Sequence, residues 1–228
     1  PWGSLSNPSL IASRWGAEPG CEHPGYVAPT GLDEASPLHF DEDLATAWRL
    51  AFAQEPSVIA EVGDILQHNA DAIISPANSF GFMDGGIDLA YSHFFGWGVE
   101  ERLRARINSD FAGELPVGCA LVIPTESHAI PYLVSAPTMR VPSRIHGTAN
   151  TYLAFRAALL AIRQHNQQAH TQIASVLVPG LGAGVGMVPP NVVARQMAAA
   201  FREVERGETA WRSTAKGVLA QHRGLLEE

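Results

Sequence analysis

Short apolar runs alternate along residues 37–204 with longer segments in which apolar positions recur every three or four residues. The runs have the length of buried strands, and the periodic segments have the length of amphipathic helices. One such helix is expected at 148–165, where Leu153, Ala157 and Leu160 fall on a single face. Strands that alternate with helices are typical of a largely parallel sheet with helices packed on it. The pattern therefore predicts an α/β sandwich.

The same pattern gives approximate limits for each element. The expected strands are 38–40, 57–62, 71–76, 118–124, 132–136 and 173–178. The expected helices are a segment from Asp41 or Asp43 to about residue 53, then 88–95, a segment that begins near 99, 148–165 and 190–204. Residues 1–36 are rich in Pro, Gly and Ser without a sustained period, so we interpret them as a flexible lead-in to one domain over 37–228. The final segment, 205–228, carries no pattern that decides between helix and coil.

The composition narrows the class of protein. The 228 residues have a hydrophobic content of 46%, enough for a core, and a formal net charge of -8. A negative chain does not hold nucleic acid mainly through its phosphates, although backbone amides can still bind the few phosphates of a nucleotide. Cys21 and Cys119 are too few for a disulfide framework or a four-cysteine metal site. With no apolar run long enough to cross a bilayer and no signal peptide in view, we expect a cytoplasmic monomer that does not bind membranes.

A polar, glycine-containing turn follows the expected strand 71–76. It runs from Asn78 to Asp88 and includes the pair Gly85 and Gly86, directly before an expected helix. Ligands of α/β proteins bind at this kind of turn, beyond the carboxyl ends of the strands. Glycines let the backbone approach a ligand closely, and free N–H groups at a helix start attract anions. The turn is therefore a candidate site for a polar, phosphorylated ligand.

A second glycine-rich loop follows the last expected strand and precedes the last expected helix. Gly180, Gly182, Gly184 and Gly186 occupy alternate positions, so the N–H groups could wrap around phosphates without a cationic side chain. The loop has no Gly-Lys-Ser/Thr sequence, which excludes a P-loop. Its late position and its Gly-x-Gly-x-Gly spacing also match a Rossmann dinucleotide fingerprint poorly. The alternative is a tight turn that needs glycine for positive φ angles.

Two aspartates have a structural alternative to a role in binding. Asp64 ends an expected strand and could accept a hydrogen bond from an exocyclic amine, or it could form an Asx turn or a helix cap. Asp88 could equally cap the helix that follows Gly86. The nine histidines show no metal-binding spacing. Ser75 and Ser79 have no base partner that the sequence reveals, so a serine triad is not supported.

Three separated motifs occur in an order and spacing that resemble the macro domain family. They are Gly63-Asp64-Ile65, the turn from Asn78 to Asp88, and the glycine-rich run 180–186. The resemblance covers about residues 57–204. It implies a three-layer α/β/α fold around a mixed sheet, with a cleft for ADP-ribose at the strand ends. It also implies ADP-ribose, or an ADP-ribosylated protein or metabolite, as the partner, without a cofactor or a metal.

By matched position, the resemblance assigns the parts of this cleft. Asp64 would bind the adenine amine with the Ile65 amide nearby, and Asn78 would contact the distal ribose. Gly85 to Ile87 would line the pyrophosphate and the distal ribose, and 182–186 would close over the phosphates. The residues implied in ligand binding are Asp64, Ile65, Ala77, Asn78, Gly85, Gly86, Ile87, Gly182, Ala183, Gly184, Val185 and Gly186.

The spacing Asn-x6-Gly-Gly-Ile-Asp is similar to that of one macro domain subgroup. That subgroup removes mono-ADP-ribose from acidic side chains and deacetylates O-acetyl-ADP-ribose. Its residue matching Asp88 helps to position or activate a water, so the resemblance implies Asp88 and Asn78 as catalytic residues. A carboxylate beside a diphosphate keeps its proton affinity through like-charge repulsion, which suits a general base.

Two departures keep a second function open. Many hydrolases of the family have an amide where this chain has Ser75, and many members have an aromatic where it has Gly186. Both differences weaken the transfer of catalysis more than the transfer of binding, so the alternative is a non-catalytic ADP-ribose reader. A nucleotide-sugar or dinucleotide enzyme of Rossmann type is a third alternative. The aromatic that stacks on adenine is not assigned, with Trp211 as one candidate.

Overall fold

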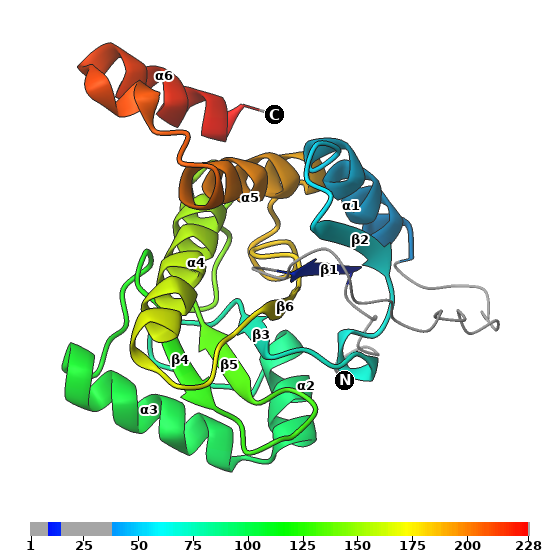
Figure 1. The fold of residues 1–228 in the computed structure, drawn as a ribbon, viewed down its shortest axis with the longest axis vertical. Helices are drawn as coiled ribbons and strands as arrows, with labels where there is room; N and C mark the ends of the chain where they lie inside the picture. Colours follow the sequence, from blue (N-terminus) through cyan, green and yellow to red (C-terminus); the bar gives the residue numbers. More distant parts are fainter. Residues whose placement is uncertain (1–8, 15–37, 228) are drawn as a thin grey trace.

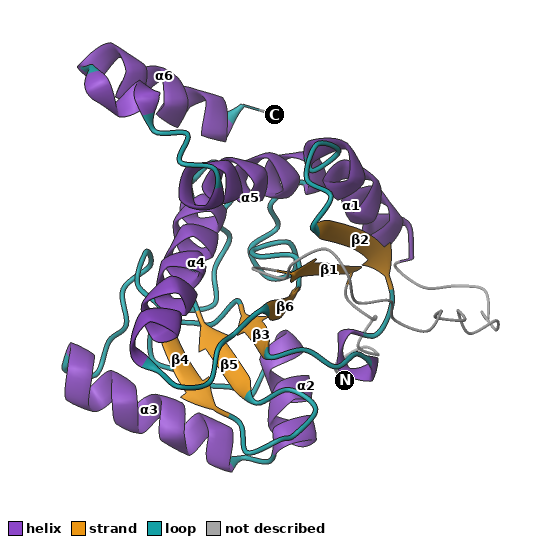
Figure 2. Cartoon of the chain, in the orientation of Figure 1, coloured by secondary structure: helices purple, strands orange, loops and turns teal. Residues whose placement is uncertain are grey.

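The computed structural model describes residues 9–14 and 38–227, which form one mixed sheet with helices on both sides (Figure 1; Figure 2). The strands are β1 (Ser9–Arg14), β2 (Val58–Val62), β3 (Ala72–Ser75), β4 (Leu121–Pro124), β5 (Tyr132–Ser135) and β6 (Ser175–Val178). The α-helices are α1 (Leu38–Ala51), α2 (Gly86–Phe95), α3 (Gly98–Phe111), α4 (Asn150–Gln168), α5 (Pro190–Glu205) and α6 (Ala215–Leu226). Two 3-10 helices are η1 (Ile65–Gln67) and η2 (Ala210–Ser213). No helix in the described part of the chain is long and apolar enough to cross a membrane.

The described strands follow the order β2-β1-β6-β3-β5-β4 across the sheet. The central strands β6, β3 and β5 pair in parallel, whereas β4 is antiparallel to β5. Because β1 is antiparallel to both β6 and β2, β2 points in the same direction as the three central strands. Four of the six strands therefore run one way, which confirms the expected mixed, largely parallel sheet. Their carboxyl ends share one edge, where α/β proteins bind ligands.

Each face of the sheet has its own layer of helices, because successive side chains of a strand point to opposite faces. Ile74 and Val134 belong to a core cluster that also contains buried residues of α1, α4 and α5. Ile73 and Leu133 belong to a second cluster, formed with α2 and α3. The three-layer α/β/α architecture is thus confirmed (Figure 1).

The N-terminal elements differ from the sequence prediction. Residues 38–40 begin α1 and do not form a strand, so that prediction is wrong. Phe40 precedes Leu44 by four residues, which is the spacing of apolar positions in a helix. The helical pattern of the sequence therefore already includes residue 40. Ser9–Arg14, inside the expected lead-in, forms β1 between β2 and β6. The apolar run of this strand, Leu10-Ile11-Ala12, is short. Its sequence neighbours include Pro, Gly and Ser, so the pattern does not predict a strand there. The remaining residues of the lead-in lie outside the described residues.

The C-terminal segment that lacked a clear pattern is helical. The hydroxyl of Thr214 accepts a hydrogen bond from the Gly217 amide at 3.0 Å and so caps the start of α6. Leu225, 3% exposed, joins the core cluster below α5. Most other side chains of α6 are exposed, which is why a strong apolar period is missing from its sequence.

Candidate ligand-binding site

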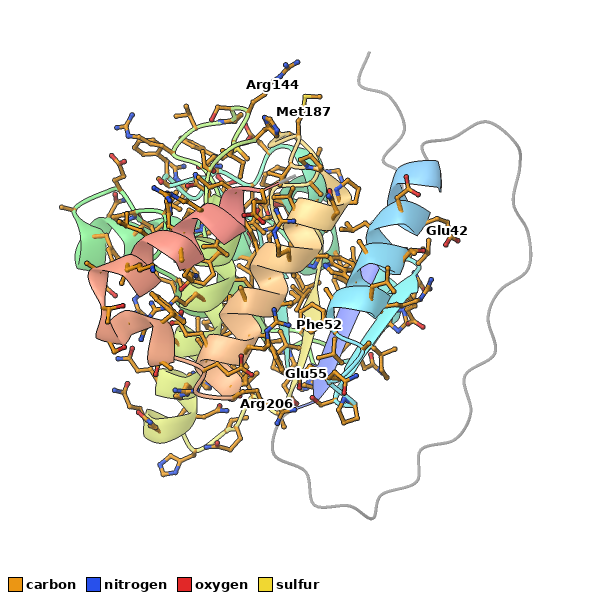
Figure 3. All side chains as sticks on the ribbon, turned by 90° about the horizontal axis from the view of Figure 1, so that it is seen from above. Glu42, Phe52, Glu55, Arg144, Met187 and Arg206 are labelled. Atoms are coloured by element: carbon orange, nitrogen blue, oxygen red, sulfur yellow. The ribbon has the colours of Figure 1, made fainter. Side chains whose placement is uncertain are left out.

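Three loops lie together at the carboxyl edge of the sheet. They are the β3 loop (76–85), the β5 loop (136–149) and the glycine loop (179–189). The amide of Thr138 donates to the Ala77 carbonyl at 3.1 Å, which joins the β5 loop to the β3 loop. The amide of Ile145 donates to the Gly186 carbonyl at 2.9 Å, which joins the β5 loop to the glycine loop. Figure 3 shows the neighbours of this second bond, Arg144 and Met187, projecting at the same end of the molecule. The two glycine motifs of the sequence are thereby brought to one edge.

The Asn78 side chain shapes the β3 loop. Its Oδ1 accepts hydrogen bonds from the amides of Phe80 and Phe82, at 3.0 and 3.3 Å. Its Nδ2 donates to the Phe82 carbonyl at 2.7 Å. Both ends of the amide are therefore used within the loop, and the expected contact of Asn78 with a ribose stays a prediction. The preceding residue, Ala77, is buried, with its carbonyl held by Thr138.

The start of α2 offers unpaired amides beside open space. Gly85 is the N-cap residue and has no capping side chain, and Gly86 has φ +58°. A Cβ at either glycine would meet nothing within 4 Å, so both border free volume. Within the described part of the chain, the amides of Gly86, Ile87 and Asp88 donate to no acceptor. A helix N-terminus of this kind attracts anions.

Asp88 is held in the first turn of α2 by a serine from the end of β3. The Ser75 hydroxyl donates to Asp88 Oδ1 at 2.7 Å, and Asp88 is 7% exposed. Asp88 does not cap the helix, since no side chain bonds its first amides. The second oxygen, Oδ2, has no hydrogen bond to a described residue and is not sealed from solvent. One oxygen is therefore oriented and the other is left for a ligand or a water.

The surroundings of Asp88 favour its protonated form. Burial raises the pKa of Asp88 from 3.8 to about 7, against the lowering effect of the Ser75 hydrogen bond, and the negative charge of Glu100 raises it further. The carboxyl therefore changes charge near neutral pH. A buried carboxyl with such a pKa, at the edge of the sheet where α/β proteins bind ligands, is a candidate general acid or base.

Ser75 is a candidate site residue that the sequence prediction missed. In the sequence it stands as a nucleophile without a base and as a departure from the family's amide, whereas the structure makes it a donor to Asp88. The sequence carries no signal for this contact, because the contact depends on how α2 packs on β3. Ser135 is its register partner on β5 and lies on the same face of the sheet. The Ser135 hydroxyl is buried and has no partner among the described residues.

Packing explains most glycines of the glycine loop. Gly182 has φ +79°, and a Cβ there would lie 2.8 Å from Ile145 Cδ1. A Cβ at Gly186 would overlap the carbonyl oxygen of Gly182, whereas one at Gly184 would meet nothing within 4 Å. The tight-turn explanation is therefore confirmed for Gly182, and Gly186 is demanded by close backbone approach.

The same loop keeps amides free. Ala183 donates to Gly180, and Val188 donates to Gly182, at 3.2 and 3.1 Å. The amides of Gly184, Val185 and Gly186 donate to no acceptor within the described ranges. Gly184 and Val185 are exposed, so those two amides belong to the outer part of the loop.

Asp64 lies at the end of β2 on the same edge, where it serves as a cap. Its Oδ1 accepts from the Leu66 amide at 3.0 Å, at the start of η1. The cap explanation is thus confirmed, and the adenine contact of Asp64 stays a prediction. Ile65 is buried in the same core cluster as Met83 and Tyr91, on the α2 and α3 side of the sheet. This packing ties η1 to the α2 side of the molecule.

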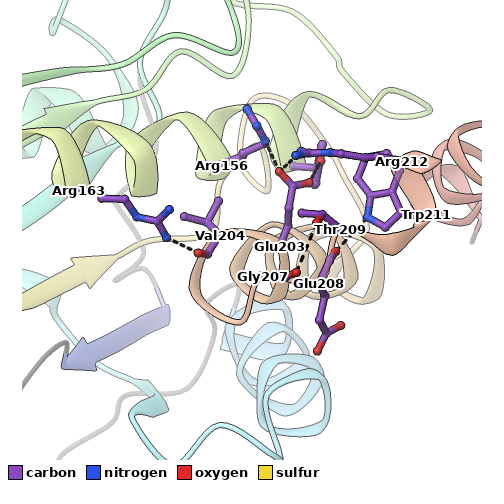
Figure 4. A network of polar contacts seen from close by, with 10 residues as sticks. Arg156, Arg163, Glu203, Val204, Gly207, Glu208, Thr209, Trp211 and Arg212 are labelled. Carbon is purple, nitrogen blue, oxygen red and sulfur yellow. Dashed lines mark hydrogen bonds and ion pairs between the residues drawn. The ribbon is translucent and has the colours of Figure 1, made fainter.

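Trp211 lies away from these loops. Its indole Nε1 donates to the Glu208 carbonyl at 3.1 Å, and the Arg212 guanidinium lies 4.9 Å from its ring centroid (Figure 4). Arg212 pairs with Glu203, which is about 20 Å along α5 from its first residue at a rise of 1.5 Å per residue. The glycine loop precedes that first residue, so Trp211 lies near the opposite end of α5. Among the described residues, no group of three or more His, Cys, Asp and Glu could hold a metal ion.

Comparison with known proteins identifies the family. Residues 59–206 match the family model described as the Macro-like domain. This match spans more than half of the chain, and the chain belongs to the macro-like domain family. An uncharacterized protein of Aeropyrum pernix is 33% identical over 168 residues, which cover 69% of this chain and 82% of that relative.

Solved structures with a similar fold agree with this assignment. The macrodomain of Mycobacterium tuberculosis DarG superposes with a TM-score of 0.51 at 26% identity, covering 62% of this chain and 87% of that one. Thermosipho africanus DarTG in complex with ADP-ribose gives a TM-score of 0.53 at 17% identity, covering 64% of this chain and 39% of that one. The latter likeness is one of fold alone.

Proposed function

We propose that this protein binds ADP-ribose at the carboxyl edge of its sheet and hydrolyses O-linked ADP-ribose. The substrates would be mono-ADP-ribosyl Asp or Glu on proteins, or O-acetyl-ADP-ribose. The observation that carries the proposal is Asp88, which Ser75 holds at the start of α2 with one oxygen free. Its spacing from Asn78, through Asn-x6-Gly-Gly-Ile-Asp, is similar to that of macro domains with this activity.

Unpaired backbone amides support the binding of a diphosphate. They occur at the start of α2 and in the outer part of the glycine loop, two segments linked through the β5 loop. Amides suit a chain of net charge -8, because they bind phosphates without a cationic side chain. Thermosipho africanus DarTG, whose fold is similar, has a structure with ADP-ribose. Adenine would lie toward Asp64, at the end of β2.

The proposed chemistry uses Asp88 as a general base. On an Asp- or Glu-linked substrate, Ser75 fixes Oδ1, so Oδ2 takes a proton from a water molecule as the water oxygen bonds to the anomeric carbon. The bond from that carbon to the acceptor oxygen breaks, and the acceptor leaves as a carboxylate. The proton then passes from Asp88 to solvent, and the products are ADP-ribose and the free acid. On O-acetyl-ADP-ribose the same base would direct the water to the carbonyl carbon of the acetyl ester, and the acetyl group leaves as acetate. A base with a pKa near the working pH contributes roughly 10²–10⁴-fold to a rate.

Turnover and binding should separate in two aspartate variants. Asp88→Ala should lose about 100-fold or more of kcat and keep its ADP-ribose affinity, because the base is lost but the amides stay. Asp84→Ala removes the same charge from an exposed position of the β3 loop that leads into α2, and it serves as the control. Calorimetry with ADP-ribose, ADP and NAD gives affinity, and release of ADP-ribose from an O-linked substrate gives kcat. Equal turnover of Asp88→Ala and the parent protein would remove Asp88 from the mechanism.

The activity of the parent protein should also depend on pH in a defined direction. The base must be ionised, so kcat/KM should rise as the pH rises through about 7, the pKa to which burial raises Asp88. A profile that is flat between pH 5.5 and 8.5 would contradict a base with this pKa.

One observation favours a second function, that of a non-catalytic ADP-ribose reader. Both ends of the Asn78 amide are used within the β3 loop, so this side chain would not orient the distal ribose for attack, whereas binding through the backbone amides would remain. A reader would show saturable binding of ADP-ribose, weakened by Asp64→Ala, and no turnover of any ester or glycosidic substrate. The activity assay on an O-linked substrate therefore separates the two functions.

A further inference from the structure

The segment that leads into Asp88 is fastened to α3. The amide of Met83 donates to Glu100 Oε2 at 2.7 Å. The Met83 carbonyl accepts from the Ser92 hydroxyl at 2.9 Å, and the Met83 side chain is fully buried. Gly81, with φ +72°, packs so closely that a Cβ would lie 2.8 Å from Ile107 Cδ1. Contacts with the helices thus set the path of the chain before Gly85. Within the described residues, Glu100 is the only carboxylate that accepts a hydrogen bond from this segment.

Glu100 lies in a partly shielded place beside a cation. Its side chain is 15% exposed, and its second oxygen, Oε1, lies 3.7 Å from Arg104 Nη1. The Arg104 guanidinium in turn lies 4.3 Å from the centroid of the Phe82 ring, in the same loop. Oε2 of Glu100 therefore accepts from the Met83 amide of the β3 loop. Oε1 faces Arg104, whose guanidinium also contacts this loop at Phe82.

The groups that interact with Asp88, by a hydrogen bond or through charge, come from three elements. Ser75 of β3 donates a hydrogen bond to it. Tyr91 of α2 points its hydroxyl at the Ile74 carbonyl, 3.3 Å away, and burial followed by the charge of Asp88 raises the pKa of this phenol well above its ordinary value. Glu100 of α3 is the charged side chain of the described residues that acts on Asp88, and it raises the pKa of that carboxyl. Neither Ser75 nor Tyr91 carries a charge near neutral pH, so the electrostatic influence comes from Glu100.

We propose that Glu100 is a positioning residue of the Asp88 site, acting through its hydrogen bond to the Met83 amide and through its negative charge. The hydrogen bond fixes the entry into Gly85 and Gly86. The charge opposes ionisation of Asp88, and Arg104 moderates that effect. The consequences for turnover and for ADP-ribose affinity rest on the proposed function, whereas the consequence for the titration of Asp88 does not.

Charge-changing variants of α3 test the electrostatic part. Glu100→Gln keeps an acceptor for the Met83 amide and removes the charge, so the titration midpoint of Asp88 should move to lower pH. Arg104→Gln removes the cation opposite Glu100 and should move the midpoint to higher pH. Glu101→Gln removes one negative charge from the exposed neighbouring position of the helix and should leave the midpoint unchanged. The midpoint is read from the side-chain carboxyl ¹³C shift of Asp88 in the full chain, with and without ADP-ribose.

A comparison of two Glu100 variants tests the hydrogen bond. Glu100→Ala loses both the charge and the acceptor, so its affinity for ADP-ribose should fall about 3–10-fold below that of Glu100→Gln. Equal affinities would overturn the role of the hydrogen bond. An Asp88 midpoint that is the same in Glu100→Gln and the parent protein, or shifts of the same sign in Glu100→Gln and Arg104→Gln, would overturn the role of the charge. If Glu100→Gln does not fold, the direction of the Arg104→Gln shift decides alone.

Failure of the proposed function would look different. A parent protein without turnover on O-linked substrates, in which Asp88 still responds to Glu100→Gln, would remove hydrolysis and leave the positioning role intact. With turnover, the rising limb of kcat/KM against pH should move to lower pH in Glu100→Gln and stay in place in Glu101→Gln. A packing defect alone would lower kcat/KM without moving the rising limb of its pH profile.

Discussion

Asp88 and Glu203 are both buried carboxylates, 7% and 6% exposed, yet their surroundings drive them in opposite directions. Asp88 has one neutral donor, Ser75, and burial raises its pKa to about 7. Burial also acts to raise the pKa of Glu203, but hydrogen bonds from Tyr152 and Arg156 and the charge of Arg212 outweigh it and lower the value (Figure 4). Two carboxyl groups of similar solvent exposure therefore differ in charge, because Asp88 changes charge near neutral pH whereas the partners of Glu203 favour its ionised form.

The difference separates the candidate functional site at Asp88 from a cluster at Glu203 that holds structural elements together. The Glu203 cluster ties together α4, α5 and η2, because its donors come from α4 and η2 and converge on one side chain of α5. Burial and the Glu203 carboxylate raise the pKa of Tyr152 to about 12, so the phenol stays a donor. Among the residues that the structure describes, Asp88 has no compensating cation, and one of its oxygens has no hydrogen-bond partner. Such uncompensated burial costs stability and is characteristic of sites kept for chemistry or binding.

The largest effect is expected from Asp88→Asn, which should stabilise the fold. The asparagine keeps an acceptor for Ser75 and removes the ionisation that burial opposes. The folded pKa of about 7 lies above the ordinary 3.8, so the stability of the parent protein declines as the pH rises from about 4 to 7. At pH 8 the variant should gain up to about 4 kcal/mol in the free energy of unfolding, and at pH 4 almost nothing. Urea denaturation at both pH values measures the two free energies of unfolding. Equal values for the variant and the parent protein at pH 8 would refute the claim that ionised Asp88 destabilises the fold.

Glu203→Ala should act in the opposite sense and cost about 2–3 kcal/mol at pH 7, because Tyr152 and two guanidinium groups lose a charged acceptor. The lowered pKa means that the contribution of Glu203 is present above pH 4.5 and is lost as the pH falls through its folded value. Glu208→Ala removes the same charge from an exposed residue and should change the stability by less than about 0.5 kcal/mol. Denaturation of both variants gives the two losses in the free energy of unfolding. Equal losses would show that the Glu203 cluster stabilises the fold no more than an exposed charge does.

A smaller effect is expected where the glycine loop closes on itself. Gly186→Ala forces a Cβ onto the Gly182 carbonyl, whereas Gly184→Ala adds a methyl group to open space. The first should cost about 1–3 kcal/mol and weaken ADP-ribose binding, and the second should leave the free energy of unfolding within about 0.5 kcal/mol. Thermal denaturation and calorimetry measure the pair. Similar results for both would show that close packing does not fix the shape of the loop.

The smallest effect should come from Ser135→Ala. The buried hydroxyl has no partner among the described residues and lies opposite Ser75 in the register. Its removal relieves an unpaired polar group and should raise the stability by about 0.5–1 kcal/mol, with no change in the Asp88 titration. A loss of stability, or a displaced Asp88 midpoint, would mean that Ser135 belongs to the functional pair.

The sequence predicted the layers of the fold because apolar runs and helical periods survive without tertiary information. It also predicted that the Asn78 to Asp88 turn and the glycine loop share one edge of the sheet. It could not show that Ser75 reaches Asp88, since that contact depends on how α2 packs on β3. Nor could it show that Gly186 is demanded by the Gly182 carbonyl, a contact within a folded loop. The departure at Ser75 counted against catalysis in the sequence, and it is the residue that orients Asp88.

The central claim is that two equally buried carboxylates are held in opposite states. The most direct test is a titration of the parent protein followed by side-chain carboxyl ¹³C shifts, with Asp88→Asn and Glu203→Gln used to assign the two signals. The account predicts a midpoint of about 7 for Asp88 and a midpoint below 4.5 for Glu203. An Asp88 midpoint near its ordinary 3.8 would contradict it, because the site would then hold a simple surface-like carboxylate.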